Sequence, residues 1–350
     1  MLAVVLVVVE LGLFVGFTVT TSSLIDHSGA DLWIVSKHVP YVEMGVPFSE
    51  RKLNQVKALE GVTDAERYVV WFALWKRPDG RQESVQVVGL NPNAKLGLPW
   101  NLVAGTAKDL RNPDAILIDE LYKAKLGVER TGEVFEINDR RARVVGFTRG
   151  IHSFTTSPYI FTSFKRALDY SGLPETQTVY ILVRVAPGEL EHVRQAILSR
   201  VKDVDVYTSS EFGRMTQVYW MFTTGAGLAV LLAAILGLVV GFVVVAQTIY
   251  ATTLDHLREF GTLKAMGAPN RFIHKLIAKQ AALSAAMGYA IGMPVSLVVV
   301  RVTKGGGAAI LLSWPMAIAI FFLTLLLCIA AGMVAIHKIS RLDPAVVFKL

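Results

Sequence analysis

Few residues of this 350-residue chain have the types and spacing that acid–base catalysis requires. The adjacent carboxylates Asp119 and Glu120 are the best candidates, because paired carboxylates can act as general acid and general base. They lie where a predicted strand, residues 114–119, meets a predicted helix, residues 120–127, and acidic side chains stabilise the first turn of a helix. We therefore interpret the pair as structural and predict that the chain is not an enzyme.

Cofactor-binding motifs are also absent from the sequence. A nucleotide-binding loop has the pattern G-x-x-x-x-G-K-[ST], in which backbone N–H groups and a lysine surround phosphate groups. The nearest match, residues 332–338, has His337 where the second glycine belongs. The seven histidines are scattered, and no H-E-x-x-H or C-x-x-C motif is present. The sequence therefore predicts that this chain binds no cofactor and no metal ion.

One charged segment, residues 257–272 (LREFGTLKAMGAPNRF), stands between two long apolar stretches. Its apolar side chains recur every three residues and would share one side of a short helix: Leu257, Phe260, Leu263 and Met266. Gly267 is suited to end this helix, and Pro269 is suited to begin the next. Two interpretations follow: a helix that lies in the lipid headgroups, or a helix presented to a partner protein in the cytoplasm.

The elements around this segment are those of a membrane protein. Hydrophobic residues make up 53% of the chain, charged residues only 18%, and the mean hydropathy is +0.48. Apolar stretches near residues 1–20, 222–246, 276–300 and 311–336 reach the length of about 20 residues that crosses a bilayer. The predicted fold is an α-helical membrane protein with four transmembrane helices and a large α+β extracytoplasmic domain inserted between helices 1 and 2.

The predicted division of the chain follows these stretches. In order, it comprises transmembrane helix 1 (1–21), the extracytoplasmic domain (22–209), a stalk that continues into transmembrane helix 2 (210–249), a cytoplasmic coupling helix (250–271), transmembrane helix 3 (272–301), a short external loop (302–310), transmembrane helix 4 (311–337) and a cytoplasmic tail (338–350).

Within the large domain, strands and helices alternate irregularly, which favours an α+β fold over a doubly wound one. Strands are expected at residues 66–77, 83–91, 114–119, 132–137, 142–148 and 178–185. A strand followed by a helix is expected at 157–172, and further helices at 120–127 and 189–201. The tripeptide Pro-Asp-Gly at 78–80 predicts a turn between the first two strands.

The distribution of lysine and arginine predicts the orientation in the membrane. Residues 247–275 and the tail carry an excess of basic side chains, whereas the link between helices 3 and 4 has only Arg301 and Lys304. Short loops rich in basic residues stay in the cytoplasm, so both termini are predicted inside and the large domain outside. The same rule explains the net charge of +7, and we expect no nucleic-acid partner.

A long helix is expected to join the large domain to transmembrane helix 2. Thr208 and Glu211 have the spacing of a capping box, and no proline follows before about Ile249. At 1.5 Å per residue, about 40 residues would extend about 60 Å, roughly twice the hydrocarbon thickness of a bilayer. The alternative is two helices with a break near Gly213 or at residues 225–227.

Glycine spacing predicts close helix contacts within the membrane. The candidate packing positions, within the chain or between two copies, are Gly237 and Gly241, and Gly288 and Gly292. This spacing is also common by chance in membrane helices.

The first apolar stretch begins at Met1 without a preceding basic residue, which favours a retained helix over a signal peptide. We expect that the cytoplasmic N-terminus of the protein is missing from this chain. Glu10, inside the stretch, is expected to face protein or an interface rather than lipid.

Residues 258–283 (REFGTLKAMGAPNRFIHKLIAKQAAL) resemble the segment after the second transmembrane helix of FtsX-like permeases, the family of the macrolide exporter and the lipoprotein-release permeases. The matching positions are Glu259, Gly261, Leu263, Lys264, Ala265, Gly267 and Ala268. The ending is also similar to that of the family, at Asp343, Pro344 and Ala345. Together with ADLWIVSK, residues 30–37, these phrases most resemble the branch of the heterocyst glycolipid exporter permease.

The resemblance implies the permease subunit of an ABC transporter, an exporter that transmits ATP-driven motion to its external domain. It implies a homodimer, a separate ABC ATPase subunit that binds ATP, a membrane-fusion adaptor and an outer-membrane channel. The implied location is the bacterial plasma (inner) membrane, with the large domain in the periplasm. The resemblance also assigns docking of the ATPase subunit to residues of the coupling helix: Leu257, Arg258, Glu259, Phe260, Gly261, Leu263, Lys264, Ala265, Met266 and Gly267.

Two other functions remain open at this point. One is a non-transporting membrane regulator of a cell-wall hydrolase or a sensor kinase. The other is a membrane-anchored binding domain without an energy source.

Overall fold

The computed structural model describes these parts of the chain: residues 1–153, 155, 157–303 and 310–340. Only the backbone is described at residues 257, 264, 265, 270 and 334–340. Most of the predicted external loop and the matching residues of the tail, such as Asp343, therefore lie outside the described residues. The chain divides into a helical unit, Met1–Gly16 with the chain from Gly227 onward, and an α+β unit, Phe17–Ala226.

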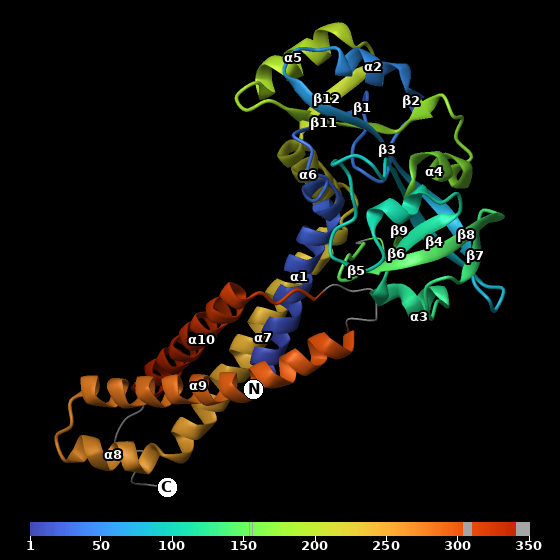
Figure 1. Cartoon of the computed structure of the whole chain (residues 1–350). Helices are drawn as coiled ribbons and strands as arrows, with labels where there is room; N and C mark the ends of the chain where they lie inside the picture. The colour runs from blue at the N-terminus through green and yellow to red at the C-terminus, as the bar shows by residue number, and fades with distance from the viewer. Residues whose placement is uncertain (154, 156, 304–309, 341–350) are drawn as a thin grey trace. The chain divides into compact units, whose positions relative to one another are not determined.

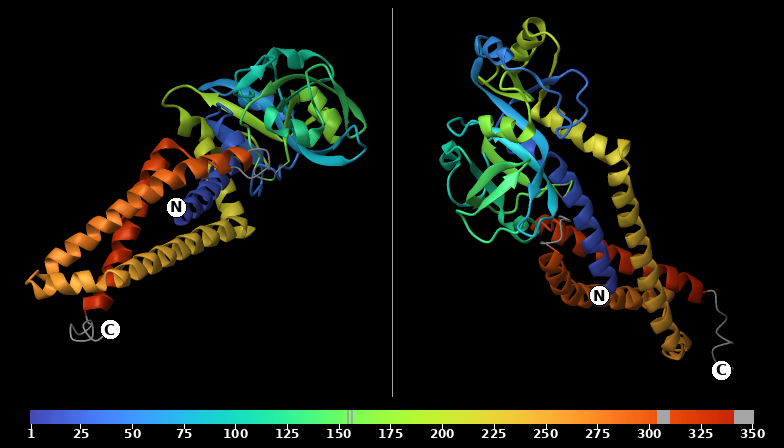
Figure 2. Two further views of the ribbon diagram at one scale, coloured as in Figure 1. Left: turned by 90° about the horizontal axis from the view of Figure 1, so that it is seen from below. Right: turned by 90° about the vertical axis from the view of Figure 1, so that its right-hand side faces the viewer.

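The helical unit contains the four long apolar helices that the sequence predicts (Figures 1 and 2). They are α1 (Leu2–Asp26, of which the first part belongs to this unit), α7 (Ala226–Asp255), α9 (Asn270–Thr303) and α10 (Trp314–Ser340). Each is long and apolar enough to cross a membrane. The end of α7 and the start of α9 extend several residues past the predicted apolar stretches. The helical hydrogen bonding continues there through polar residues, which a search for apolar stretches does not include.

The first helix packs closely against α7 and α9 at the predicted glycines. A Cβ atom on Gly237 would lie 3.0 Å from Cγ of Glu10, and one on Gly292 would lie 2.9 Å from Cβ of Val4. Glu10 therefore lies against α7, and the small residues let the helices approach. Three of the four glycines, Gly237, Gly241 and Gly292, face α1 of the same chain, and Gly288 faces the backbone nitrogen of Met1, just before α1. A contact with a second copy at these positions stays a prediction.

The α+β unit is organised by one long strand, β3 (Val62–Lys76), which pairs with β11 through its first half and with β4 through its second half. The remaining strands of this sheet are β1 (Leu32–Ser36), β4 (Gln82–Leu90), β5 (Leu102–Ala104), β6 (Ala115–Asp119), β7 (Val134–Ile137), β8 (Arg140–Thr148), β9 (Tyr159–Ser163), β11 (Tyr180–Val185) and β12 (Val204–Thr208). A separate small pair is formed by β2 (Phe48–Ser49) and β10 (Gln177–Thr178).

Two subdomains share β3. In the first, the antiparallel order β12-β1-β11-β3 is covered by α2 (Arg51–Lys57) and α5 (Leu190–Arg200) (Figure 1). In the second, β7 pairs with both β8 and β3, so the strands β3-β4-β9-β6-β8-β7 close on themselves, and α4 (Phe164–Ser171) packs beside them. This mixture agrees with the predicted α+β class. The sequence interpretation did not name β1, β12 or α2.

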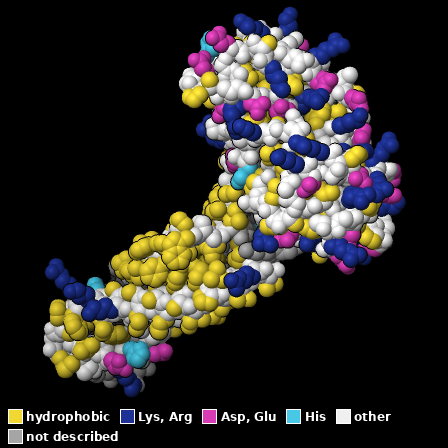
Figure 3. All heavy atoms as spheres, in the orientation of Figure 1, with side chains coloured by type: hydrophobic (Ala, Val, Ile, Leu, Met, Phe, Trp, Pro, Cys, Tyr) yellow, Lys and Arg dark blue, Asp and Glu magenta, His cyan; other side chains and the backbone are white. Residues whose placement is uncertain are grey.

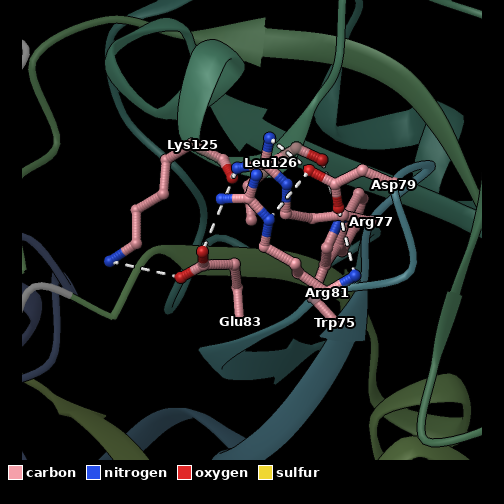
Figure 4. A network of polar contacts seen from close by, with 7 residues as sticks. All are labelled: Trp75, Arg77, Asp79, Arg81, Glu83, Lys125 and Leu126. Atoms are coloured by element: carbon pink, nitrogen blue, oxygen red, sulfur yellow. Dashed lines mark hydrogen bonds and ion pairs between the residues drawn. The ribbon is translucent and has the colours of Figure 1, made fainter.

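The predicted turn between β3 and β4 is present and is fixed by charged side chains (Figure 4). Gly80 has a φ of +83°, which glycine adopts without strain. The guanidinium of Arg77 lies 3.2 Å from the carboxylate of Asp79 and also donates to the carbonyl of Lys125 in α3 (Lys123–Leu126). These contacts join the turn to a neighbouring helix and account for a charged cluster that has no catalytic geometry.

The prediction of one continuous helix from residue 209 to residue 249 is wrong. The capping box is present, since Thr208 and Glu211 exchange hydrogen bonds of 2.9 and 3.1 Å at the start of α6 (Ser209–Val218). The chain then forms a π-helical turn, Tyr219–Thr223, and Gly225 has a φ of +73° before α7 begins. A residue in the left-handed conformation interrupts a helix. The alternative prediction, two helices with a break at residues 225–227, is therefore correct.

The loop between β1 and β2, residues 37–47, packs on this π-helical turn. The ring of Tyr41 stacks on Tyr219 at 4.2 Å, and the indole N–H of Trp220 donates to the carboxylate of Glu43 at 3.4 Å. The side chain of Glu43 is only 8% exposed. Burial raises the pKa of Glu43 to about 7, and the hydrogen bond from Trp220 opposes that rise only in part.

We predict that replacing Gly292 with alanine destabilises the helical unit, whereas the same change at Gly332 does not. The new Cβ at Gly292 would lie 2.9 Å from Val4, but at Gly332 it would lie 3.5 Å from Ala281, an ordinary contact. Overpacking should lower the free energy of unfolding by about 1–3 kcal/mol. Melting temperatures in detergent check this, and a Val4→Ala change should restore part of the loss. Equal melting temperatures for both glycine variants would contradict the packing.

We also predict that Glu43 makes stability fall between about pH 5 and pH 8. The folded chain holds a proton that the unfolded chain has already lost above the ordinary pKa of 4.5, so the stabilisation is complete below that pH and disappears as pH rises through about 7. The shift corresponds to at most about 3 kcal/mol. A Glu43→Gln variant, which imitates the protonated carboxyl, should melt at a temperature that changes less over this range. An exposed control, Glu175→Gln, should keep the wild-type pH profile.

Candidate functional site

The candidate site is the short helix α8 (Leu257–Ala265), which only His256 separates from the end of α7. It ends as predicted: Gly267 has a φ of +95°, and the N–H of Ala268 donates to the carbonyl of Leu263 at 3.0 Å. This 6→1 hydrogen bond is that of a Schellman motif. The carbonyl of Pro269 then accepts from the first turn of α9. The C-terminal end of α8 is thus capped at Gly267, and α8 is a separate short helix between two long ones.

The surface of α8 mixes charged and apolar groups. Arg258 and Glu259 are exposed, Phe260 and Leu263 are half-buried, and Met266 is 71% exposed at the end of the helix. On the apolar side predicted from the spacing, the side chains in the middle of the helix are therefore half-buried, and the side chain at its end is exposed. A surface of this kind can bind a protein groove through the apolar groups and select its partner through the charges.

Not every predicted docking residue can be placed. The side chains of Leu257, Lys264 and Ala265 lie outside those that the structure describes. Gly261 is half-buried, and Gly267 is exposed beside Met266. The assignment of these residues to docking stays a prediction.

Charge is arranged along α8 in the sense that helices favour. Glu259 lies in the first turn, where the helix dipole favours a negative charge. Its carboxylate lies 3.0 Å from Nδ1 of His256, and this hydrogen bond raises the pKa of His256. Exposed Arg271 and Lys275 follow at the start of α9. Figure 3 shows such charged groups at the end of the unit, beyond the hydrophobic side chains of the long helices.

The sequence interpretation missed two apolar residues that flank α8. Leu254, in the last turn of α7, and Phe272, in the first turn of α9, are both exposed. Leu254 lies three residues before Leu257 and so continues the three-residue period, which could have identified it. Phe272 lies beyond the turn at Gly267, where helical spacing carries no information.

The carboxylate pair in the α+β unit has a structural role, as the sequence predicts. Buried Asp119 accepts hydrogen bonds from the N–H of Leu121 at 3.0 Å, the hydroxyl of Thr148 at 2.9 Å and the N–H of Ile151 at 2.8 Å. Glu120 forms an ion pair of 2.9 Å with an exposed arginine. Among the residues that the structure describes, no three His, Cys, Asp or Glu side chains are grouped to hold a metal ion.

Comparison with known families identifies both parts of the chain. Residues 1–200 match the model of the MacB-like periplasmic core domain, and residues 231–344 match that of the FtsX-like permease C-terminal region. The first match alone covers more than half of the 350 residues.

Individual relatives are distant but cover much of the chain. An uncharacterised ABC transporter permease of Mycobacterium tuberculosis is 24% identical, over 96% of this chain and 89% of that protein. The macrolide export ATP-binding/permease protein MacB of Escherichia coli is 23% identical, over 70% of this chain and 40% of that protein. The solved periplasmic region of MacB from Actinobacillus actinomycetemcomitans has a TM-score of 0.41 and 12% identity, covering 53% of this chain and 92% of that one.

Three structural features agree with the matches to both family models. They are four membrane-length helices, a mixed α+β unit at Phe17–Ala226 and a short polar helix between the second and third long helices. The chain belongs to the family that combines a MacB-like periplasmic core domain with an FtsX-like permease C-terminal region, and it is the permease subunit of an ABC transporter.

Proposed function

We propose that α8 is the docking helix for a separate ABC ATPase subunit, and that the permease transmits ATP-driven motion to its α+β unit in order to export a substrate. The observation that carries this proposal is α8 itself, a short helix between two membrane-length helices, with a Schellman motif at its C-terminal end and a mixed charged and apolar surface. The E. coli relative is named as both ATP-binding protein and permease, whereas this chain lacks a nucleotide-binding loop. ATP binding and hydrolysis would therefore belong to the partner subunit, and this chain would bind no cofactor.

The proposed location is the bacterial plasma (inner) membrane, with α8 in the cytoplasm and the α+β unit in the periplasm. The basic residues around α8 support this orientation, since short basic loops stay inside. Two copies of the permease would form a homodimer. In an exporter of this kind, the periplasmic units would work with a membrane-fusion adaptor and an outer-membrane channel.

The physical connection from α8 outward supports force transmission. Because a single residue separates α8 from α7, a displacement of α8 acts on a helix that continues to Ala226. In the α+β unit, α6 is bound to the last turns of α1: the amide of Gln217 donates to the carbonyl of Thr18 at 3.1 Å and to the hydroxyl of Ser22 at 2.9 Å. Within the α+β unit, α6 is thus bound to the end of α1, whose first part is membrane-spanning.

We predict that the double change Glu259→Lys and Leu263→Asp abolishes co-purification with the ATPase subunit. It reverses a charge and places a carboxylate on the half-buried apolar side, and losses above about 2 kcal/mol are usual for central contact residues. The milder change Met266→Ala should weaken binding about tenfold or less, through lost apolar contact. Pull-down from membranes, with a binding titration, measures both effects.

A matched control carries the same two chemical changes away from α8. Glu175→Lys and Leu198→Asp lie at exposed positions of the α+β unit and should leave ATPase binding unchanged. The proposal is contradicted if the α8 variant, with a normal melting temperature, still binds the ATPase subunit with wild-type affinity.

A further inference from the structure

The π-helical turn of the α+β unit, Tyr219–Thr223, occupies a defined place in the chain relative to the membrane. Residues 227–246 of α7 contain no charged, hydroxyl or amide side chain. Twenty helical residues extend about 30 Å, which is the thickness of the hydrocarbon layer. The turn, which comes just before these residues in the chain, therefore lies directly outside the hydrocarbon layer. Tyrosine and tryptophan are enriched at this level.

The loop between β1 and β2 is held beside this turn within the same unit. Tyr41 stacks on Tyr219 at 4.2 Å and meets the edge of Trp220 at 5.4 Å. Glu43 accepts the hydrogen bond from Trp220. The loop thus lies against the turn, although it is about 180 residues away in the sequence.

The loop is fixed so that its tip faces outward. The hydroxyl of Tyr180 donates to the carbonyl of Val42 at 2.8 Å, and the hydroxyl of Ser36 donates to the carbonyl of Val46 at 2.9 Å. At Gly45 the backbone comes so close to the sheet that a Cβ atom would lie 2.1 Å from Val179. The loop therefore has no room to fold inward and cover its own apolar side chains.

Several large apolar side chains at this place remain exposed: Met44 at 55%, Val46 at 49% and Phe222 at 65%. Residues 39–47 and 219–223, all of which the structure describes, contain a single ionisable carboxylate, and that group, Glu43, is buried. An apolar and aromatic surface without exposed charge is suited to the membrane interface and offers nothing to select a charged protein partner.

We propose that these residues form an interfacial patch, through which the α+β unit rests on the bilayer surface at the end of α7. The patch comprises Tyr41, Met44, Val46, Tyr219, Trp220 and Phe222. Its occupant is phospholipid, at the depth of the headgroups and the first methylene groups. The patch gives the unit a contact with the membrane in addition to its two connecting helices. Any movement that lifts the unit from the membrane has to expose these side chains to water.

The test uses the full chain in phosphatidylcholine nanodiscs. Cys328 is the only cysteine, so a Cys328→Ala background allows single labels at Met44→Cys and Val46→Cys. The matched control is Leu198→Cys, which is 42% exposed on α5 of the same unit. Each site carries an environment-sensitive fluorophore, and lipids with a nitroxide near the headgroup serve as quencher.

We expect quenching at residues 44 and 46 to exceed that at residue 198 by at least about twofold, with emission shifted to the blue, as for side chains at a membrane interface. Equal quenching at all three sites would overturn the proposal. So would cross-linking between residue 44 of two copies, because the occupant would then be a second copy. The melting temperature of each labelled variant shows that it is folded, and two independent loop sites protect against the loss of one variant.

Discussion

A peptide group inside the hydrocarbon layer must make its hydrogen bonds within its own helix, because neither water nor an irregular loop can satisfy it there. The chain can therefore cross the membrane only as whole helices, and its polar surfaces must lie at the turns between them. The described long helices carry few ionisable groups, and one of these, Glu10, lies against α7. Polar docking surfaces are therefore expected at the ends of the helices, and α8, which carries charged side chains, lies at such an end.

The break at Gly225 changes how motion can pass between the two ends. A single helix of about 40 residues would have acted as a rigid rod. The structure instead has α6, a π-helical turn and α7, so the rod is interrupted before α7 begins. Within the α+β unit, the turn that precedes this break is held by the stacking of Tyr41 on Tyr219 and by the hydrogen bond from Trp220 to Glu43. Burial raises the pKa of Glu43 to about 7, so we expect the packing of the loop on the turn to weaken as pH rises.

Much of this architecture could be predicted from the sequence, for identifiable reasons. Apolar stretches of membrane length mark α1, α7, α9 and α10, and the capping box at Thr208 marks the start of α6. Gly267 and Pro269 mark the turn after α8, because their backbone preferences are local. The role of Asp119 was also readable from its place between a strand and a helix.

What could not be predicted depends on contacts between distant residues. The closure of the second subdomain rests on β7 pairing with both β3 and β8, which no local pattern reveals. The packing of the loop at Tyr41 on the turn at Tyr219 joins segments far apart in sequence. The π-helical turn has no proline to announce it, so the capping box and the absence of proline up to about Ile249 favoured one helix, with a break at residues 225–227 as the alternative. The proposed partner of α8 is another chain, so neither this sequence nor this fold contains its contact surface.

The central claim is that α8 is covered by protein rather than by lipid. Amide hydrogen exchange across residues 257–268, in the reconstituted permease with and without its ATPase subunit, measures this most directly. The account predicts that exchange in this segment is fast in the permease alone and slows at least about tenfold when the ATPase subunit is bound. Slow exchange in lipid alone, unchanged by the ATPase subunit, would contradict it and would place α8 in the headgroups.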